Sequence, residues 1–309
     1  MKKKLLISAG AVALVAALLA GTWLFALPAI VAMSDADYAA FVSAQTVWQN
    51  SMGEAIPQTE IYAVMVQHML QQDDSRPRKL LFIVYDGALA SAAGVRAMEY
   101  PDGPIGTFAA QGMWLAHAGG VHALGDQTTD TAPGFASMFT GVWGAQNGIT
   151  SNSDTLLSEH HTIMYRLHEA GLRVRFSYSW RSHGAVNYHH EMERAPELFD
   201  FSRNDVGTVV SMLDAIESGY DAVFGSLEHT DTWGHITGYH HRNPFYMRAF
   251  SRAECDAARL ISAVQARVEV YGEDWLIILA SDHGGIGINH GGTSLMESIT
   301  WFASNRGIF

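Results

Sequence analysis

The chain has 309 residues and a formal net charge of −12, with 48% hydrophobic and 16% charged residues. This composition is typical of a folded protein with room for one large core, and the acidic balance argues against non-specific binding to a nucleic-acid backbone, which requires a basic surface. A single cysteine, Cys255, excludes an internal disulfide. Its position within a helical pattern predicts a buried, inert thiol.

The N-terminus has the charge order of an exported or membrane-anchored protein. Three lysines at positions 2–4 precede an almost uncharged apolar stretch over residues 5–33. This stretch is closer to the about 20 residues of a spanning helix than to the roughly 7–15 of a cleaved signal. The best cleavage position, after Ala32, has Ile30 where a small residue is preferred. We therefore expect residues 1–33 to be an uncleaved membrane anchor, with a cleaved signal as the alternative, and the body of the protein to lie outside the cytoplasm.

Residues 34–78 are expected to form a helical lead-in, because apolar residues recur there at helical spacing and a proline flanked by arginines ends the segment. Residues 79–309 are expected to form the catalytic domain, since apolar runs and amphipathic segments alternate there as in α/β proteins. Strands are predicted at 80–85, 120–124, 172–178, 222–227, 275–280 and 299–303, and helices at 108–116, 133–140, 162–170, 206–218 and 247–271. The continuous apolar runs are typical of buried parallel strands.

Residues suited to binding a metal follow three of these strands. Asp86 comes directly after the first predicted strand, Asp231 lies shortly after the fourth, and Asp282 and His283 follow the fifth. In open α/β sheets, ligands bind beyond the carboxyl ends of the strands. We therefore expect these side chains to converge at one edge of one sheet.

Two histidines extend this set. His235 lies four residues after Asp231, so the two share a face if their segment is helical. His290 lies in a glycine-rich loop that can fold back over the site. Oxygen and nitrogen ligands without thiolates suit zinc or a similar divalent ion, with manganese or iron as alternatives.

Thr131 lies at the predicted start of the helix 133–140, where free backbone N–H groups and the helix dipole favour an anion such as phosphate. A metal-bound hydroxyl there would be deprotonated near neutral pH and could act as a nucleophile. Two divalent cations would balance three aspartates and one threonine alkoxide, which leaves a nearly neutral site for a phosphoryl group. Taken alone, Thr-x-Pro is an ordinary helix entrance.

Seven short motifs occur in the chain in this order: Asp86-Gly87, Thr131-Ala132-Pro133, Thr140-Gly141, Asn147-Gly148-Ile149, Asp231-x-x-Gly234-His235, Asp282-His283-Gly284 and His290-Gly291. As an ordered set they resemble the alkaline phosphatase superfamily. Within it, the type I phosphodiesterases and nucleotide pyrophosphatases are most similar, with phosphonoacetate hydrolase as a relative. The resemblance implies a three-layer α/β/α sandwich with a central, mostly parallel sheet, two zinc ions and a phospho-threonine intermediate.

The resemblance also implies which residues hold the metals. One ion would be held by Asp231, His235 and His290, and the other by Asp86, Asp282, His283 and the hydroxyl of Thr131. The chain departs from the family pattern at Gly134, where nucleotide pyrophosphatases usually have an asparagine that helps to hold a phosphoryl oxygen. It is also expected to be a compact member without long substrate-reading insertions, since it ends soon after the strand 299–303.

The expected function is an exported two-metal hydrolase of phosphodiester or pyrophosphate bonds that works through phospho-Thr131. A phosphomonoesterase, phosphonate hydrolase or phospholipid headgroup transferase on the same site is the alternative, and a metal-bound envelope protein without activity is a third hypothesis. A sulfatase is disfavoured, because that branch needs Cys or Ser in a Cys/Ser-x-Pro-x-Arg context, which is absent here. The expected partners are a small-molecule or lipid-linked phosphate ester and the membrane, and no nucleic-acid polymer.

Overall fold

The computed structural model describes residues 33–70, 76–120 and 125–307. Residues 1–32, which form nearly all of the predicted membrane anchor, lie outside this described part. Among the helices that are described, none is both long enough and apolar enough to span a bilayer.

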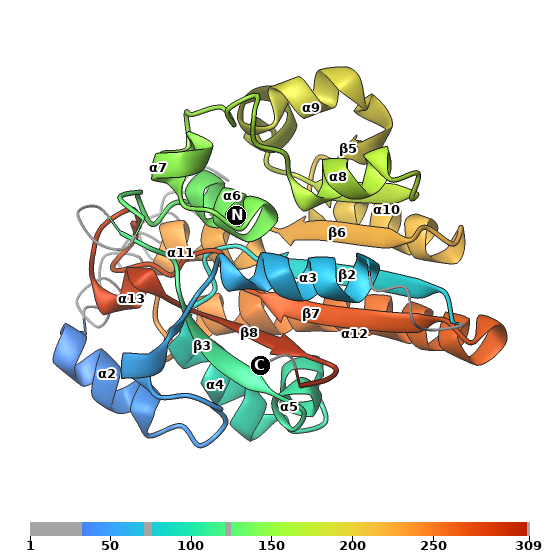
Figure 1. Cartoon of the computed structure of the whole chain (residues 1–309). Helices are drawn as coiled ribbons and strands as arrows, with labels where there is room; N and C mark the ends of the chain where they lie inside the picture. The colour runs from blue at the N-terminus through green and yellow to red at the C-terminus, as the bar shows by residue number, and fades with distance from the viewer. Residues whose placement is uncertain (1–32, 71–75, 121–124, 308–309) are drawn as a thin grey trace, which may run out of the picture.

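Within the described residues, an eight-stranded sheet runs through the centre of the molecule (Figure 1). Its spatial order is β1-β3-β8-β7-β2-β6-β4-β5. The strands are β1 (Ile56–Pro57), β2 (Arg78–Tyr85), β3 (Met113–His117), β4 (Val174–Tyr178), β5 (Phe199–Phe201), β6 (Ala222–Leu227), β7 (Asp274–Ala280) and β8 (Ile299–Ser304). Strand β8 is antiparallel to β3 and β7, and the other neighbouring pairs are parallel.

Strand β2 lies in the middle of the sheet and is apolar on both faces. Leu80 is in register with Ala222 of β6 and with Leu276 of β7. Alternate side chains of β2 belong to two different hydrophobic clusters, so Ile83 packs in one and Phe82 in the other. Because successive side chains of a strand point to opposite faces, a continuous apolar run is what a doubly covered strand requires.

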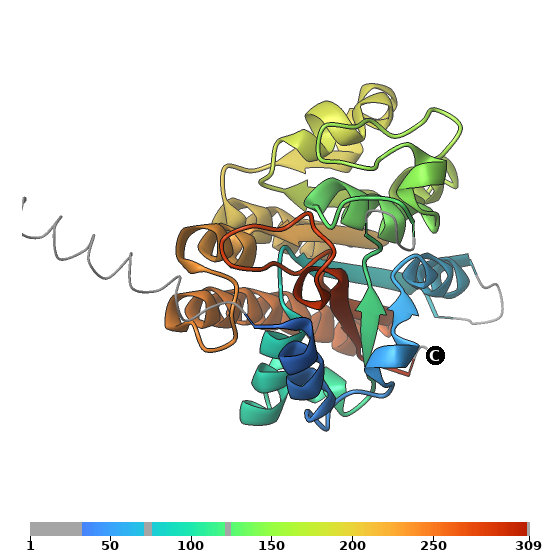
Figure 2. The same cartoon turned by 90° about the vertical axis from the view of Figure 1, so that its left-hand side faces the viewer.

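Helices cover both faces of the sheet (Figures 1 and 2). One face packs against α2 (Asp35–Ser43), α4 (Ala90–Glu99), α5 (Pro104–Ala109), α10 (Asp205–Glu217) and α12 (Pro244–Tyr271). The other packs against α3 (Glu60–Leu70), α6 (Thr131–Thr140) and α8 (Ile163–Glu169). The predicted three-layer α/β/α sandwich with a mostly parallel sheet is therefore confirmed.

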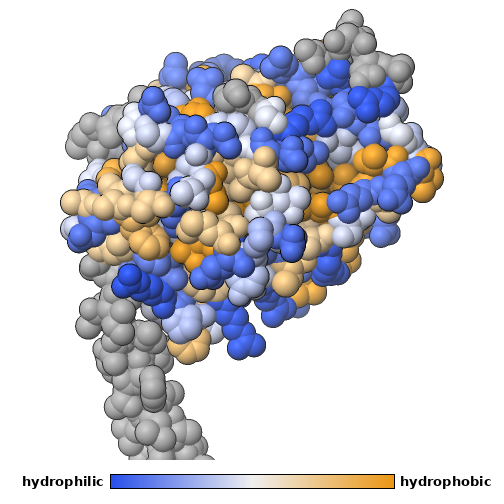
Figure 3. All heavy atoms as spheres, turned by 90° about the horizontal axis from the view of Figure 1, so that it is seen from below, coloured by the Kyte–Doolittle hydropathy of each residue, from blue (hydrophilic) through white to orange (hydrophobic). Residues whose placement is uncertain are grey.

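Shorter elements complete the described fold. They are α7 (Gly144–Asn147), α9 (His189–Arg194), α11 (His229–Thr237), α13 (Leu295–Ser298), the 3-10 turns η2 (Met52–Glu54) and η4 (Pro196–Leu198), and the π-helical turn η3 (His183–Asn187). Seen from below, the outer surface is a mosaic of hydrophilic and hydrophobic residues (Figure 3).

Residues 34–70 pack onto the same two cores as the remainder of the chain. Strand β1 pairs with β3 through Ile56 and Ala116. Tyr38 of α2 is buried in one hydrophobic cluster, and Ile61 of α3 is buried in the other. The segment expected as a lead-in therefore contributes an edge strand and two covering helices.

One predicted element was wrong, and another could not be compared with the structure. The helix predicted at 108–116 ends at Ala109, and residues 113–117 form β3 between β1 and β8. The strand predicted at 120–124 falls largely outside the described residues. A short apolar run such as Met113 to Ala116 fits either a buried helix turn or a buried strand, so periodicity alone cannot assign it.

The helix predicted at 247–271 is present as α12, but its cysteine is exposed rather than buried. The buried side of α12 is formed by residues such as Phe250, Ala257 and Leu260. Cys255 lies two residues before Ala257 and so points to nearly the opposite side of the helix. The prediction of the helix is therefore confirmed, and the prediction that Cys255 is buried was wrong.

Candidate metal centre and active site

Thr131 is the first residue of α6, and its hydroxyl faces two of the predicted metal ligands. Thr131 Oγ1 lies 3.5 Å from Asp86 Oδ1 and 3.3 Å from His283 Nε2. The extended backbone of Asp130, the N-cap residue, leads the chain into the helix. All ten residues of α6 are buried, so the helix holds this hydroxyl on a rigid support at a helix N-terminus, where anions are favoured.

Asp86 follows β2 directly and is fully buried. The next residue, Gly87, has a φ of +62°, and its N–H donates to Asp282 Oδ1 at 3.1 Å. A Cβ atom on Gly87 would lie 2.7 Å from Asp231 Oδ1. Only glycine allows both the left-handed backbone and the close approach to a carboxylate. Because Gly87 contacts Asp282 and Asp231, this turn holds the ends of β2, β7 and β6 close together.

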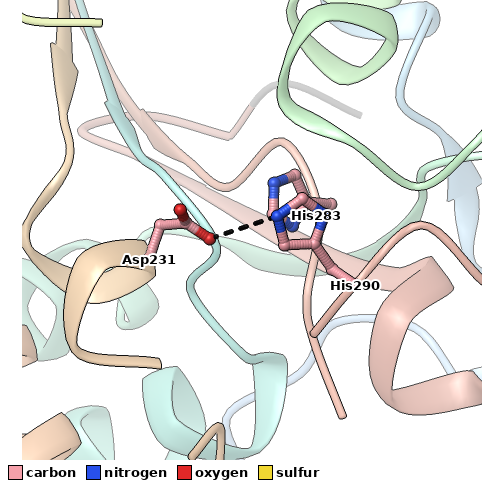
Figure 4. Close-up of side chains that lie close together, drawn as sticks. All are labelled: Asp231, His283 and His290. Atoms are coloured by element: carbon pink, nitrogen blue, oxygen red, sulfur yellow. Dashed lines mark ion pairs between the residues drawn. The ribbon is translucent and has the colours of Figure 1, made fainter. Parts of the chain in front are cut away.

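Asp231 and His235 lie one turn apart on α11, which begins two residues after β6. His235 Nε2 is 3.3 Å from Asp231 Oδ2, so the two side chains share a face as the four-residue spacing predicted. His290 reaches the same place from the loop after β7, with its Nε2 3.6 Å from Asp231 Oδ1 (Figure 4). The same nitrogen lies 3.1 Å from His235 Nε2.

His283 joins the two halves of the site. Its Nε2 is 3.3 Å from Asp86 Oδ1 and 3.5 Å from Asp282 Oδ2. Two groups of possible ligand atoms, each within 4.8 Å of one another, share this residue: Asp231, His283 and His290 form one group, and Asp86, Asp282 and His283 form the other. Together with Thr131 and His235, the structure thus brings all seven residues named from the sequence to the carboxyl ends of β2, β6 and β7.

The three histidines present the same nitrogen to the centre. Nδ1 of His235 lies 2.8 Å from the carbonyl oxygen of Ile288, Nδ1 of His283 lies 2.6 Å from that of Gly284, and Nδ1 of His290 lies 2.8 Å from Asp130 Oδ1. Each Nδ1 thus has an acceptor outside the centre, and each Nε2 faces the centre, where it can serve as a metal ligand. This is how proteins fix histidine ligands of a metal.

Each of the two buried carboxylates has one oxygen without a partner. Asp86 Oδ2 and Asp282 Oδ2 are buried, and neither has a hydrogen-bond partner among the described residues. Burial, with the charges of the neighbouring acids, raises the pKa of both groups well above the usual value. Burial lowers the pKa of His283 to about 3, so its ring is neutral. Unpaired carboxylate oxygens and bare imidazole nitrogens aimed at one space are the donor set of a divalent cation.

Asp231 behaves differently from the other two acids. Burial acts to raise its pKa, but the hydrogen bond with His235 and the neighbouring imidazoles outweigh this effect and lower the pKa to about 2. Tyr239 also donates its hydroxyl to Asp231 Oδ1. Asp231 is thus held ionised and fixed in position.

Sequence reasoning missed Asp130, which supports the site from directly before Thr131. Its Oδ1 accepts from His290, and its Oδ2 accepts from Thr128 Oγ1 at 2.5 Å. Burial opposes ionisation, but these two hydrogen bonds outweigh it and lower the pKa of Asp130. An aspartate directly before the first helical residue is a common N-cap, so a search for caps would have selected it, although not its contact with His290.

The departure at Gly134 has a steric cause. A Cβ atom there would lie 2.6 Å from the carbonyl oxygen of Asp282 and 2.9 Å from its Cβ, so no asparagine fits. Another asparagine, Asn152, lies at the same end of α6, where its Oδ1 accepts from the N–H of Ala132 at 2.9 Å. Its amide nitrogen makes no hydrogen bond within the described residues and is free to donate. The sequence position of Asn152 carried no signal that we recognised.

The fold and the site define this chain as an α/β protein with a candidate metal centre at the carboxyl ends of its parallel strands. Residues 126–300, more than half of the chain, match the profile of the type I phosphodiesterase / nucleotide pyrophosphatase family. The chain therefore belongs to the type I phosphodiesterase / nucleotide pyrophosphatase family. Asp86 lies outside the matched segment, and the fold brings it to the other six residues.

Similar solved structures agree with this fold. The sulfatase-like protein yidJ of Bacteroides fragilis is 11% identical with a TM-score of 0.51, over 76% of this chain and 69% of that one. Mouse ectonucleotide pyrophosphatase / phosphodiesterase 5, an inactive form in complex with AMP, is 17% identical with a TM-score of 0.48, over 67% of this chain and 57% of that one. Phosphonoacetate hydrolase from Sinorhizobium meliloti 1021, in complex with phosphonoacetate, is 15% identical with a TM-score of 0.45, over 68% and 57%.

At these identities the likeness shows the fold alone. The chain spans less than two thirds of the length of the last two proteins. No curated protein matches the chain in a sequence comparison.

Proposed function

We propose that this chain is an exported, membrane-anchored phosphohydrolase that cleaves phosphodiester or pyrophosphate bonds through a covalent intermediate on Thr131. The observation that carries the proposal is the position of the Thr131 hydroxyl, within 3.5 Å of both Asp86 and His283 at the N-terminus of a buried helix. A nucleophile, ligands for a cation and donors for an anion thus meet at one point.

The donor set fits two divalent ions, with zinc favoured because the donors are imidazole nitrogens and carboxylate oxygens without thiolates. One ion would be held by Asp231, His235 and His290, and the other by Asp86, Asp282, His283 and Thr131 Oγ1. When bound, such ions lower the pKa of a coordinated hydroxyl or water and offset the charge of the phosphoryl group.

The residues of the chain then carry two displacements. In the first, Thr131 Oγ1, after losing its proton, forms a bond to phosphorus while the bond from phosphorus to the leaving oxygen breaks, and that oxygen departs with the electron pair. In the second, a water oxygen bonds to phosphorus from the same side that the leaving group vacated, and the bond to Thr131 Oγ1 breaks. The free amide of Asn152 and the N–H of Thr131 would donate to a non-bridging oxygen, since the N–H of Ala132 already donates to Asn152 Oδ1 and Pro133 has none.

Removing the hydroxyl tests this role. A Thr131→Ala variant is expected to lose at least about 10³-fold in turnover of bis(para-nitrophenyl) phosphate and to keep nearly all of its bound metal, measured by elemental mass spectrometry. The matched control is Thr107→Ala, since Thr107 is exposed on α5 far along the sheet from the site. Unchanged turnover in Thr131→Ala would refute the proposed nucleophile.

The same assay separates the alternatives. Para-nitrophenyl phosphate, its diester and a nucleotide are compared side by side at equal metal loading. A preference for the monoester would replace the diesterase assignment with a phosphomonoesterase on the same site. Retained metal without turnover of any substrate would favour the non-enzymatic hypothesis.

A further inference from the structure

A cavity of about 360 Å³ opens between α11 and the first turns of α12, outside the metal centre. It is lined by His229, Trp233, Phe245, Arg248, Ala249 and Arg252. Trp233 is two residues from Asp231 and two from His235, so it points to nearly the opposite side of α11 from these ligands. The cavity is therefore a separate feature on the outer side of the helix that supplies two of the ligands.

The basic lining of this cavity is not neutralised. Arg248 and Arg252 lie one turn apart on α12, both are exposed, and neither forms an ion pair or hydrogen bond within the described residues. The carboxylate one turn further on, Asp256, pairs instead with Arg259 at 3.2 Å. Two adjacent unpaired guanidinium groups on a chain of net charge −12 form a site for phosphate or another anion.

Large apolar side chains surround these arginines. Trp233 is 38% exposed and Phe245 is 47% exposed, and their rings stack with centroids 6.1 Å apart and planes 9° apart. Ile236, at the next turn of α11, is 52% exposed. Aromatic and aliphatic groups beside basic ones are the composition of a surface that enters the headgroup region of a membrane.

The described chain begins beside this surface. Phe41 of α2 stacks on His241, in the loop between α11 and α12, with ring centroids 3.9 Å apart. Asp35 accepts a hydrogen bond from the N–H of Leu295 at 2.8 Å, which fixes the start of α2 next to α13. The described chain, which begins at residue 33, therefore starts near the end where α11 meets α12; Figure 2 shows the blue start and the orange α11–α12 region.

We propose that the surface formed by Trp233, Ile236, Phe245, Arg248 and Arg252 docks onto the anionic lipid bilayer that holds the N-terminal anchor. The two arginines bind lipid phosphates, and the three apolar side chains lie among the headgroups. This inference rests on the membrane anchoring proposed above and does not depend on the role of Thr131.

Hydrogen exchange on the full chain in lipid nanodiscs tests this. Nanodiscs of phosphatidylcholine alone are compared with nanodiscs containing phosphatidylglycerol, and exchange is followed in peptides covering residues 229–252. Two basic residues at an anionic surface favour the docked state by roughly 30-fold, so we expect clear slowing of exchange in the anionic discs only. The variant Arg248→Glu with Arg252→Glu should lose this slowing and keep its turnover of the soluble diester.

The matched control is Arg194→Glu with Arg203→Glu, which makes the same charge change at two exposed arginines away from α11 and α12; it should retain the slowing. Equal exchange in both lipids, or slowing that survives in the Arg248/Arg252 variant, would overturn the proposal. Slowing that rises with protein concentration in detergent would assign the surface to a second copy and also overturn it. If the chain does not co-purify with nanodiscs, the proposed membrane anchor is refuted, and the docking proposal with it. A chain that docks but does not cleave the diester would refute the proposed catalytic function and leave the docking proposal supported.

Discussion

His183 is fully buried, and neither of its ring nitrogens has a hydrogen-bond partner in the part of the chain that the structure describes. Its ring lies among those of Phe135 at 4.4 Å, Trp180 at 4.9 Å and Phe176 at 5.3 Å, and is parallel to that of Tyr188 within 4°. Burial lowers its pKa to about 3. We therefore predict that His183 destabilises the folded state in acid and that a His183→Phe variant loses this effect.

The sign and size follow from proton binding. Unfolded histidine has a pKa of about 6.5, so between about pH 6.5 and pH 3 the unfolded chain holds a proton at residue 183 that the folded chain does not. The free energy of unfolding then falls by about 1.4 kcal/mol per pH unit as the pH drops through this window, which amounts to roughly 2 kcal/mol between pH 7 and pH 5. His241 and His283, whose pKa values are also lowered to about 3 by burial, contribute equally to both proteins and cancel.

The assay is urea unfolding of both proteins in mild detergent, followed by circular dichroism at pH 7, 6 and 5. The stability of His183→Phe relative to the parent should increase by roughly 2 kcal/mol from pH 7 to pH 5, whatever the packing cost of phenylalanine at neutral pH. If the phenylalanine ring prevents folding, His183→Leu replaces His183→Phe in this comparison. Parallel stability curves for the parent and the variants would show that His183 takes up its proton in the folded state and would refute the reasoning.

Three further predictions concern the metal centre. Gly87→Ala should abolish diesterase activity, because the new Cβ would lie 2.7 Å from Asp231 Oδ1. The control is Gly171→Ala, at a glycine that also has a positive φ, +86°, but has open space around it. This variant should lose only about 1 kcal/mol of stability and keep its activity. Asp130→Asn should weaken zinc binding by about 10–100-fold in a calorimetric titration, since it removes the charge that orients His290; unchanged affinity would contradict this. Chelation of the metal should lower the melting temperature. Returning zinc at a hundredfold excess over its dissociation constant should raise the free energy of unfolding by about 3 kcal/mol and restore the melting temperature. Identical melting curves with and without the chelator would exclude a resident metal.

Much of the fold was accessible from the sequence, because burial on both faces leaves a plain pattern. The run from Leu80 to Tyr85 is typical of a central strand, and the groups after such strands meet at one edge of a parallel sheet. This argument predicted that Asp86, Asp231 and Asp282 would be neighbours, and the structure places them so. The pattern failed at residues 113–117, where the partner of the strand, β8, lies almost 200 residues further along the chain, and no local signal records that pairing.

The supporting residues of the site were harder to foresee, for a different reason. Asp130 and Asn152 act through backbone contacts and ring nitrogens that only tertiary packing brings near, so their types carry little information by themselves. Gly134 is the opposite case. The sequence showed that a glycine stands where the family usually has an asparagine, and the structure gives the reason: a Cβ atom at residue 134 would lie 2.6 Å from the carbonyl oxygen of Asp282. The helix that carries Thr131 packs so tightly against the strand end that carries Asp282 that a side chain between them is excluded. In the proposed mechanism, a side-chain donor to the phosphoryl oxygen then comes from outside α6, and Asn152 lies at the N-terminus of this helix.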